Sequence, residues 1–152
     1  MKPPEHRLHL ASYPFHVELQ TRFGDMDALR HVNNVAIAGL YEDARVRFTK
    51  EQVRTSAASE AMKSWNPFVV HHAIDYLAEV RYPAPVVIAM GVSAVGRTSL
   101  SLGCALFQEG SCRSLATCTM VLVDIASHRP TPVTAELRAV LEQLRVAEAP
   151  PS

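Results

Sequence analysis

Hydrophobic and polar residues follow two different periods in the first third of the chain. Within residues 15–23 the apolar side chains fall on one face of an extended chain, a pattern that predicts a half-buried strand: Phe15, Val17, Leu19 and Phe23. From about residue 34 to residue 50 apolar residues recur three or four positions apart, which predicts an α-helix. The helical face consists of Ile37, Leu40, Tyr41, Ala44 and Phe48.

The start of this helix carries two asparagines, Asn33 and Asn34. Either is a good N-cap, because an asparagine side chain accepts a hydrogen bond from a free N–H group of the first helical turn. Residues 35–40 are apolar on all sides of the helix. We therefore expect the first half of the helix to be deeply buried.

The second half of the chain is predicted to form mainly strands. Residues 51–66 are polar and small, and are typical of a fraying helix or a long connection. Turn residues then separate runs of about ten residues, which predicts an antiparallel meander. The predicted strands are Phe68–Arg81, Val86–Val95, Ser99–Gln108 and Leu115–Asp124. A last amphipathic helix follows, with Thr131 as its N-cap and Pro132 at its first position.

This order of elements predicts an α+β fold, in which one long antiparallel sheet packs against a buried helix. Its length of 152 residues fits a single domain. We expect residues 1–13 to be an N-terminal extension, residues 14–146 to form the domain and residues 147–152 to be a flexible tail.

Composition narrows the classes of function. The chain has 15 Lys and Arg residues and 15 Asp and Glu residues, so it lacks the basic excess of a nucleic-acid-binding protein. No apolar stretch is long enough to span a bilayer, and the first residues do not resemble a secretory signal. Three cysteines without a Cys-x-x-Cys pair argue against a disulfide framework and a structural zinc site. We therefore expect a cytoplasmic protein that binds neither nucleic acid nor membranes.

The polar segment between the first strand and the helix carries a motif. It reads Arg-Phe-Gly-Asp-Met-Asp over residues 22–27 and His-Val-Asn-Asn over residues 31–34, and Glu-Asp-Ala-Arg follows on the helix at residues 42–45. This arrangement resembles the active-site signature of the 4-hydroxybenzoyl-CoA thioesterase family, a group with the hotdog fold. The predicted order of elements fits as well, so the resemblance covers residues 14–146.

The resemblance implies a hotdog fold, in which the sheet wraps around the helix of residues 34–50. It also implies an acyl-CoA substrate, Asp27 as the catalytic carboxylate, and a homodimer with sheets joined edge to edge, or a homotetramer. At residues 36–39 the chain reads Ala-Ile-Ala-Gly, where the family usually has an aromatic residue and acidic residues. The acyl group accepted by this chain is therefore left open.

The residue types in the motif fit thioester hydrolysis. An ionised aspartate such as Asp27 can activate water as a general base or attack the carbonyl carbon itself, and the sequence leaves both open. The backbone N–H of Asn34, at a helix N-terminus, is the candidate oxyanion donor. His31 is either a second acid–base group or a polar residue that orders the loop. The candidates for binding the substrate are Asn33, Arg81 and Arg97.

Other interpretations of these residues are weaker. An isolated Asp-x-Asp is more often a turn in which the carboxylates cap backbone N–H groups, and we interpret Asp25 in that structural way. The adjacent His71 and His72 point to opposite faces of a predicted strand, so we expect no metal site, and no cofactor is predicted. Two alternative functions remain: a hotdog dehydratase and a non-catalytic protein that binds acyl-CoA or an acyl carrier.

Overall fold

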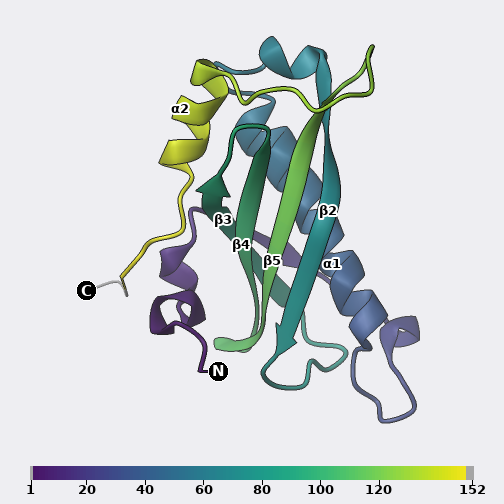
Figure 1. The fold of residues 1–152 in the computed structure, drawn as a ribbon. Helices are drawn as coiled ribbons and strands as arrows, with labels where there is room; N and C mark the ends of the chain where they lie inside the picture. The colour runs from purple at the N-terminus through teal and green to yellow at the C-terminus, as the bar shows by residue number, and fades with distance from the viewer. Residues whose placement is uncertain (1, 150–152) are drawn as a thin grey trace.

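The computed structural model describes residues 2–149 as one sheet, one long helix and a shorter C-terminal helix (Figure 1). The main elements are β1 (Phe15–Leu19), α1 (Asn34–Phe48), β2 (Trp65–Tyr76), β3 (Val86–Val95), β4 (Ser99–Gln108), β5 (Ser111–Asp124) and α2 (Ala135–Gln143). The strands lie in the order β1-β3-β4-β5-β2, and every neighbouring pair is antiparallel.

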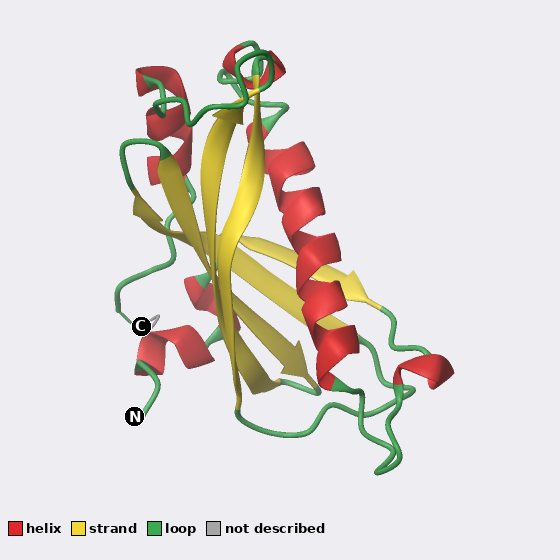
Figure 2. Cartoon of the chain, turned by 45° about the vertical axis from the view of Figure 1, so that its right-hand side comes forward, coloured by secondary structure: helices red, strands yellow, loops and turns green. Residues whose placement is uncertain are grey.

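The sheet curves around α1, which runs along its concave face (Figure 2). Ile37, Tyr41, Ala44 and Phe48 are buried there, at the spacing of one helical face. The Tyr41 hydroxyl lies 2.7 Å from Ser114 Oγ on β5, so the polar end of this buried ring has a partner. A long antiparallel sheet wrapped around a central helix is the hotdog fold, which confirms the predicted fold class.

The burial of α1 differs from the prediction in one respect. Only one face of the helix is buried, and Val35 in its first turn is 76% exposed. Gly39 is also exposed, and Leu40 is half-buried. One helix on one face of a sheet can turn only one stripe of side chains inward. The prediction of burial on all sides is therefore wrong for the single chain.

Several element boundaries also differ from the predicted ones. The first strand ends at Leu19 because residues 23–25 form a 3-10 turn, and β2 covers residues 65–76 instead of 68–81. The last helix begins after Thr134, whose side chain accepts from the Leu137 N–H, so the predicted cap at Thr131 is wrong. The Thr131 N–H instead donates to the Leu122 carbonyl on β5, which keeps this segment extended.

Residues near both ends of the described chain pack on the convex face of the sheet. The Arg7 guanidinium donates to the carbonyls of Cys104 and Ala116, at 3.1 and 2.6 Å. Val146 packs so closely on β3 that a Cβ on Gly91 would lie 2.9 Å from its Cγ2 atom. The Ala147 N–H donates to the Ser12 carbonyl. The predicted domain boundaries stay predictions, and residues 150–152 of the predicted flexible tail lie outside the described residues.

Between residues 2 and 149, no helix combines the length and the apolar character that crossing a membrane requires.

Candidate active site

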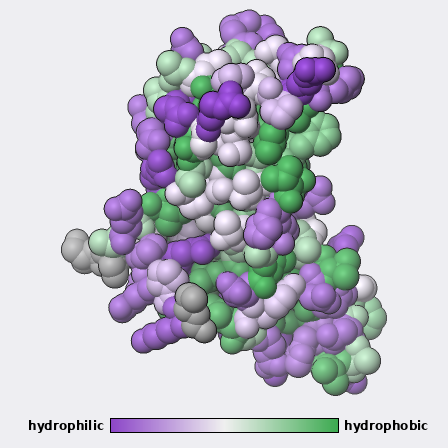
Figure 3. Space-filling model, viewed as in Figure 1, coloured by the Kyte–Doolittle hydropathy of each residue, from purple (hydrophilic) through white to green (hydrophobic). Residues whose placement is uncertain are grey.

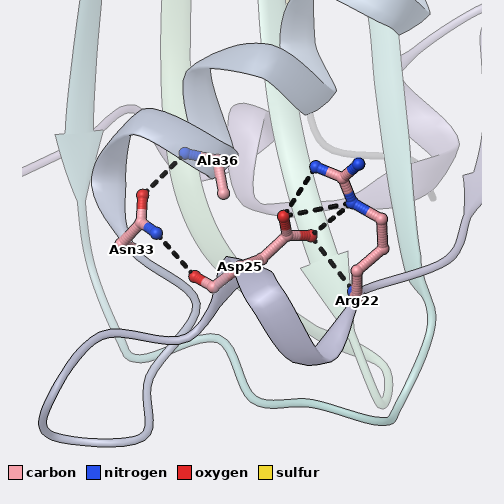
Figure 4. Close-up of polar contacts among 4 residues, drawn as sticks. All are labelled: Arg22, Asp25, Asn33 and Ala36. Atoms are coloured by element: carbon pink, nitrogen blue, oxygen red, sulfur yellow. Dashed lines mark hydrogen bonds and ion pairs between the residues drawn. The ribbon is translucent and has the colours of Figure 1, made fainter.

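The motif segment leaves β1, crosses the end of the sheet and enters α1. Its first part is fixed by the buried carboxylate of Asp25, which accepts from the Arg22 guanidinium at 2.8 Å and from the Arg22 backbone N–H at 3.1 Å (Figure 4). The Asp25 carbonyl accepts from the backbone and side-chain N–H groups of Asn33, and Asn33 Oδ1 accepts from the Ala36 N–H. Asn33 is therefore the N-cap of α1, and it also connects the helix to the preceding turn by hydrogen bonds.

The ion pair between Arg22 and Asp25 makes the stability of this turn depend on pH. Hydrogen bonding to Arg22 lowers the pKa of Asp25 below its usual value. A lowered folded-state pKa stabilises the fold above the unfolded pKa of about 3.9, and this stabilisation is lost as the pH falls through the folded value. The ion pair of Asp25 therefore makes its full contribution to the stability of the fold at neutral pH.

We expect Asp25→Asn to lower Tm at pH 7 by about 2–4 °C, the shift that one net hydrogen bond produces in a chain of this size. The difference from the parent should shrink as the pH falls below about 4. Thermal unfolding followed by circular dichroism at several pH values measures both effects. Asp27→Asn is the control, because Asp27 is exposed; an equal loss of Tm in the two variants would contradict the role given to Asp25.

Asp27 lies in the tight loop that follows, and one oxygen of its carboxylate holds the loop. Oδ1 accepts from the N–H groups of Leu29, at 2.8 Å, and His31, at 3.1 Å. A backbone bond of 2.8 Å from the Asp27 N–H to the His31 carbonyl closes the same loop. Within the described chain, Oδ2 has no recorded hydrogen-bond partner. The carboxylate is thus oriented by one oxygen while the other stays available to a water or a substrate.

The loop is attached to a segment that is distant in sequence. The buried Val32 donates its N–H to the carbonyl of Val80, after β2. The buried side chain of Gln108, at the end of β4, holds the next residues by accepting from the Arg81 N–H and donating to the carbonyls of Arg81 and Ala84. Arg81 is therefore carried to the Asp27 loop by backbone contacts that the core fixes.

A chain of ionic contacts joins the two segments. His31 Nε2 lies 2.5 Å from a carboxylate oxygen of Glu79, and the other oxygen of Glu79 accepts from the Arg81 guanidinium. Glu79 therefore fixes the direction of both side chains. Nε2 of His31 faces Glu79, and within residues 2–149 the other ring nitrogen has no hydrogen-bond partner.

Asp27, His31 and Arg81 line a cavity of about 820 Å³ at the end of the sheet. Phe23 and Tyr82 contribute an apolar wall, with their rings in an edge-to-face contact at 5.9 Å. The full lining consists of Phe23, Met26, Asp27, Ala28, Leu29, Arg30, His31, Arg81 and Tyr82. The cavity thus combines one available carboxylate, cationic groups and aromatic surface.

The structure brings together three of the predicted site residues, Asp27, His31 and Arg81. The N–H of Asn34 lies at the first position of α1 and has no recorded acceptor among residues 2–149, but Asn34 does not line the cavity of the single chain. Arg97 lies in the turn between β3 and β4. This turn is separated from the cavity by the ten residues of β3, about 30 Å of extended chain.

The other reactive side chains lie away from this cavity. Burial raises the pKa of Cys104 to about 12 and that of Cys112 to about 11, which makes both poor nucleophiles. Burial also lowers the pKa of His72, which packs edge-to-face on Tyr41. In the part of the chain that the structure describes, no three metal-ligating side chains form a cluster.

Sequence reasoning missed Phe23, Arg30, Glu79, Tyr82 and Gln108. Phe23 lies inside the motif and Arg30 between two of its parts, and their type alone does not show that they face a cavity. Glu79, Tyr82 and Gln108 follow β2 or end β4, and no motif marks them. Only the packing of the 79–82 segment against the 26–32 loop reveals their position.

Comparison with known proteins agrees with the fold and the motif. The pattern that defines the Thioesterase-like superfamily matches residues 21–141, which is most of the chain. The protein therefore belongs to this superfamily. Membership of the narrower 4-hydroxybenzoyl-CoA thioesterase family stays a prediction. A comparison with curated protein sequences finds no match.

Solved structures of similar fold include several thioesterases. The chain superimposes on the PA5185 protein of Pseudomonas aeruginosa with a TM-score of 0.76 and 26% identity, over 91% of this chain and 96% of that one. For a thioesterase from Thermus thermophilus, complexed with coenzyme A and Zn, the TM-score is 0.70 and the sequence identity 25%, over 85% of this chain and 98% of that one. For a 1,4-dihydroxy-2-naphthoyl-CoA thioesterase from Synechocystis the TM-score is 0.71, over 86% of this chain and 96% of that one. At 13% sequence identity this likeness shows the shared fold alone.

Proposed function

We propose that this protein hydrolyses an acyl-CoA or aryl-CoA thioester to the free acid and CoA, with Asp27 as the catalytic carboxylate. The observation that carries the proposal is the carboxylate itself: one oxygen is fixed by two backbone N–H groups and the other is available in a cavity lined by cationic and aromatic residues. The complex of the Thermus thermophilus relative with coenzyme A supports the choice of carrier.

The reaction requires several contributions from the chain. Asp27 takes a proton from the attacking water or attacks the carbonyl carbon itself. The free N–H of Asn34 stabilises the negative charge on the carbonyl oxygen. The CoA thiol has an ordinary pKa of about 8.5, so it leaves as a thiolate with little acid assistance. When Asp27 acts as the general base, the proton that it took from the attacking water passes to the thiolate directly or through His31 as a second acid–base group. Arg81, which lines the cavity, contributes to holding the substrate, and Asn33 acts through the N-terminus of α1 that it caps.

The proposal includes a second copy of the chain. Strand β2 is an edge of the sheet, and α1 beside it exposes Val35 and Val46. Figure 3 shows hydrophobic side chains along the side of the molecule on which β2 and α1 lie. The large exposed apolar residues of β2 are Phe68, Val69, Val70 and Tyr76. A long apolar edge strand is suited to pairing with the same strand of another copy, in a two-fold dimer that extends the sheet.

A thiol-release assay over aliphatic and aromatic acyl-CoAs tests the proposed activity. We expect steady turnover with at least one group of substrates. Saturable binding of acyl-CoA without thiol release would contradict the proposed enzyme activity and favour the non-catalytic acyl-CoA-binding protein. A dehydratase is disfavoured because α1 carries no histidine within residues 34–48.

A further inference from the structure

Arg30 has a backbone conformation that its side chain does not favour. Its φ angle is +63°, in the left-handed region where the Cβ of an L-residue is crowded and where glycine or asparagine is usual. The conformation is required here, because the Arg30 N–H donates to the Asp27 carbonyl inside the loop that is closed between Asp27 and His31. A glycine would form this turn with less strain, so the arginine side chain is not explained by the turn.

The surroundings of the Arg30 side chain point to a ligand. It is exposed and lines the same cavity as Asp27. The other arginine of the cavity, Arg81, is paired with Glu79, which also holds His31. Within residues 2–149, Arg30 has no recorded ion pair or side-chain hydrogen bond. Among residues 2–149, no carboxylate is paired with this guanidinium, in contrast to that of Arg81.

We propose that Arg30 is a specificity-determining residue that binds an anionic group of the thioester substrate, an inference that rests on the proposed function. A guanidinium forms two parallel hydrogen bonds with a phosphate or a carboxylate, and both occur in this substrate class. The anion is either a phosphate of the CoA part or a carboxylate on the acyl part. The arginine at position 30 thus lowers the stability of the backbone turn and increases the affinity for the substrate.

Arg30→Gly separates these two effects because they change in opposite directions. The variant should unfold at a Tm about 2–4 °C higher than the parent, since the strain of the left-handed residue is removed. Its KM should rise tenfold or more, the loss expected for one charge-assisted hydrogen bond, with a smaller change in kcat. Arg30→Lys, which keeps the charge, should lose less affinity than Arg30→Gly.

His128→Gly is the matched control. His128 also has a positive φ, +56°, but it lies in the turn after β5, outside the cavity. His128→Gly should raise Tm in the same way and leave KM unchanged.

The choice of substrate shows which anion Arg30 binds. If Arg30 binds a CoA phosphate, thioesters of N-acetylcysteamine, which lack the nucleotide, should be hydrolysed equally by parent and Arg30→Gly. If it binds an acyl carboxylate, only dicarboxylic acyl thioesters should be affected, on either carrier.

An unchanged KM for every substrate in Arg30→Gly, together with the higher Tm, would overturn the inference and leave Arg30 as a tolerated turn residue. Failure of the proposed function is a different result, namely no thiol release by the parent protein. In that case calorimetric titration with CoA and with a dicarboxylic acyl-CoA decides the inference. Binding at least tenfold weaker in Arg30→Gly supports it, and equal binding of both ligands overturns it.

Discussion

Replacing Asp27 with asparagine is expected to lower the kcat of thioester hydrolysis by about a hundredfold or more, the contribution that general-base catalysis alone makes. Asparagine keeps the size of the side chain and an oxygen that accepts from the N–H groups of Leu29 and His31. It removes the negative charge from a side chain that lines the cavity. The change therefore acts on the chemistry more than on the loop, and a thiol-release assay with the best acyl-CoA measures it.

Two measurements make the Asp27 prediction specific. Binding of CoA, followed by calorimetry, should survive in Asp27→Asn, because the cationic groups that hold the substrate are unchanged. Asp25→Asn is the matched control: its carboxylate is buried against Arg22, so it should lose stability and keep most of its turnover. A folded Asp27→Asn protein with near-parental turnover would refute the mechanism, and Glu42 and His31 would be the next carboxylate and base to replace.

Placing a lysine at Val70 is expected to convert a dimer into a monomer. Val70 is 61% exposed on the edge strand β2, and a shift in the pairing with β5 leaves it without a partner residue. A charged side chain in the middle of an edge strand opposes pairing with a second strand, because the charge would be desolvated in the interface between the two strands. Light scattering at micromolar concentration should give the mass of at least two chains for the parent and a mass smaller by dissociation at this edge for Val70→Lys, down to one chain if the parent is a dimer.

Turnover should fall when the dimer is lost in Val70→Lys, because we expect the active site to be shared between the two subunits. Ile125→Lys is the control, because Ile125 is also exposed but lies in the turn after β5. It should remain dimeric and active. A parent protein that is monomeric at micromolar concentration, or a monomeric Val70→Lys that retains full turnover, would be incompatible with a shared site.

The sequence determined the secondary structure of most of the core. Strands β3 and β4 run over the predicted residues, and the spacing of Ile37, Tyr41, Ala44 and Phe48 predicted the buried face of α1. These features are local, because a strand or helix that buries one face must repeat apolar residues with its own period. The Asp27 motif is local as well: the side chain bonds to backbone groups two and four residues further along the chain.

What the sequence did not determine depends on contacts between distant segments or on competition between neighbouring caps. Glu79 and Gln108 are ordinary polar residues until the sheet brings them to the Asp27 loop, where they hold His31 and Arg81. Arg97 resembles Arg81 as a candidate in the sequence, yet β3 carries it to the other end of the sheet.

Cap choice and exposed surface were also decided by the tertiary structure. Thr131 and Thr134 are equivalent N-caps by propensity, and the bond from the Thr131 N–H to Leu122 on β5 selects Thr134. The apolar first half of α1 predicted burial on all sides, whereas the sheet covers one side and leaves Val35 exposed. A sequence shows which residues favour burial or capping, but only the packed chain determines which of them find a partner.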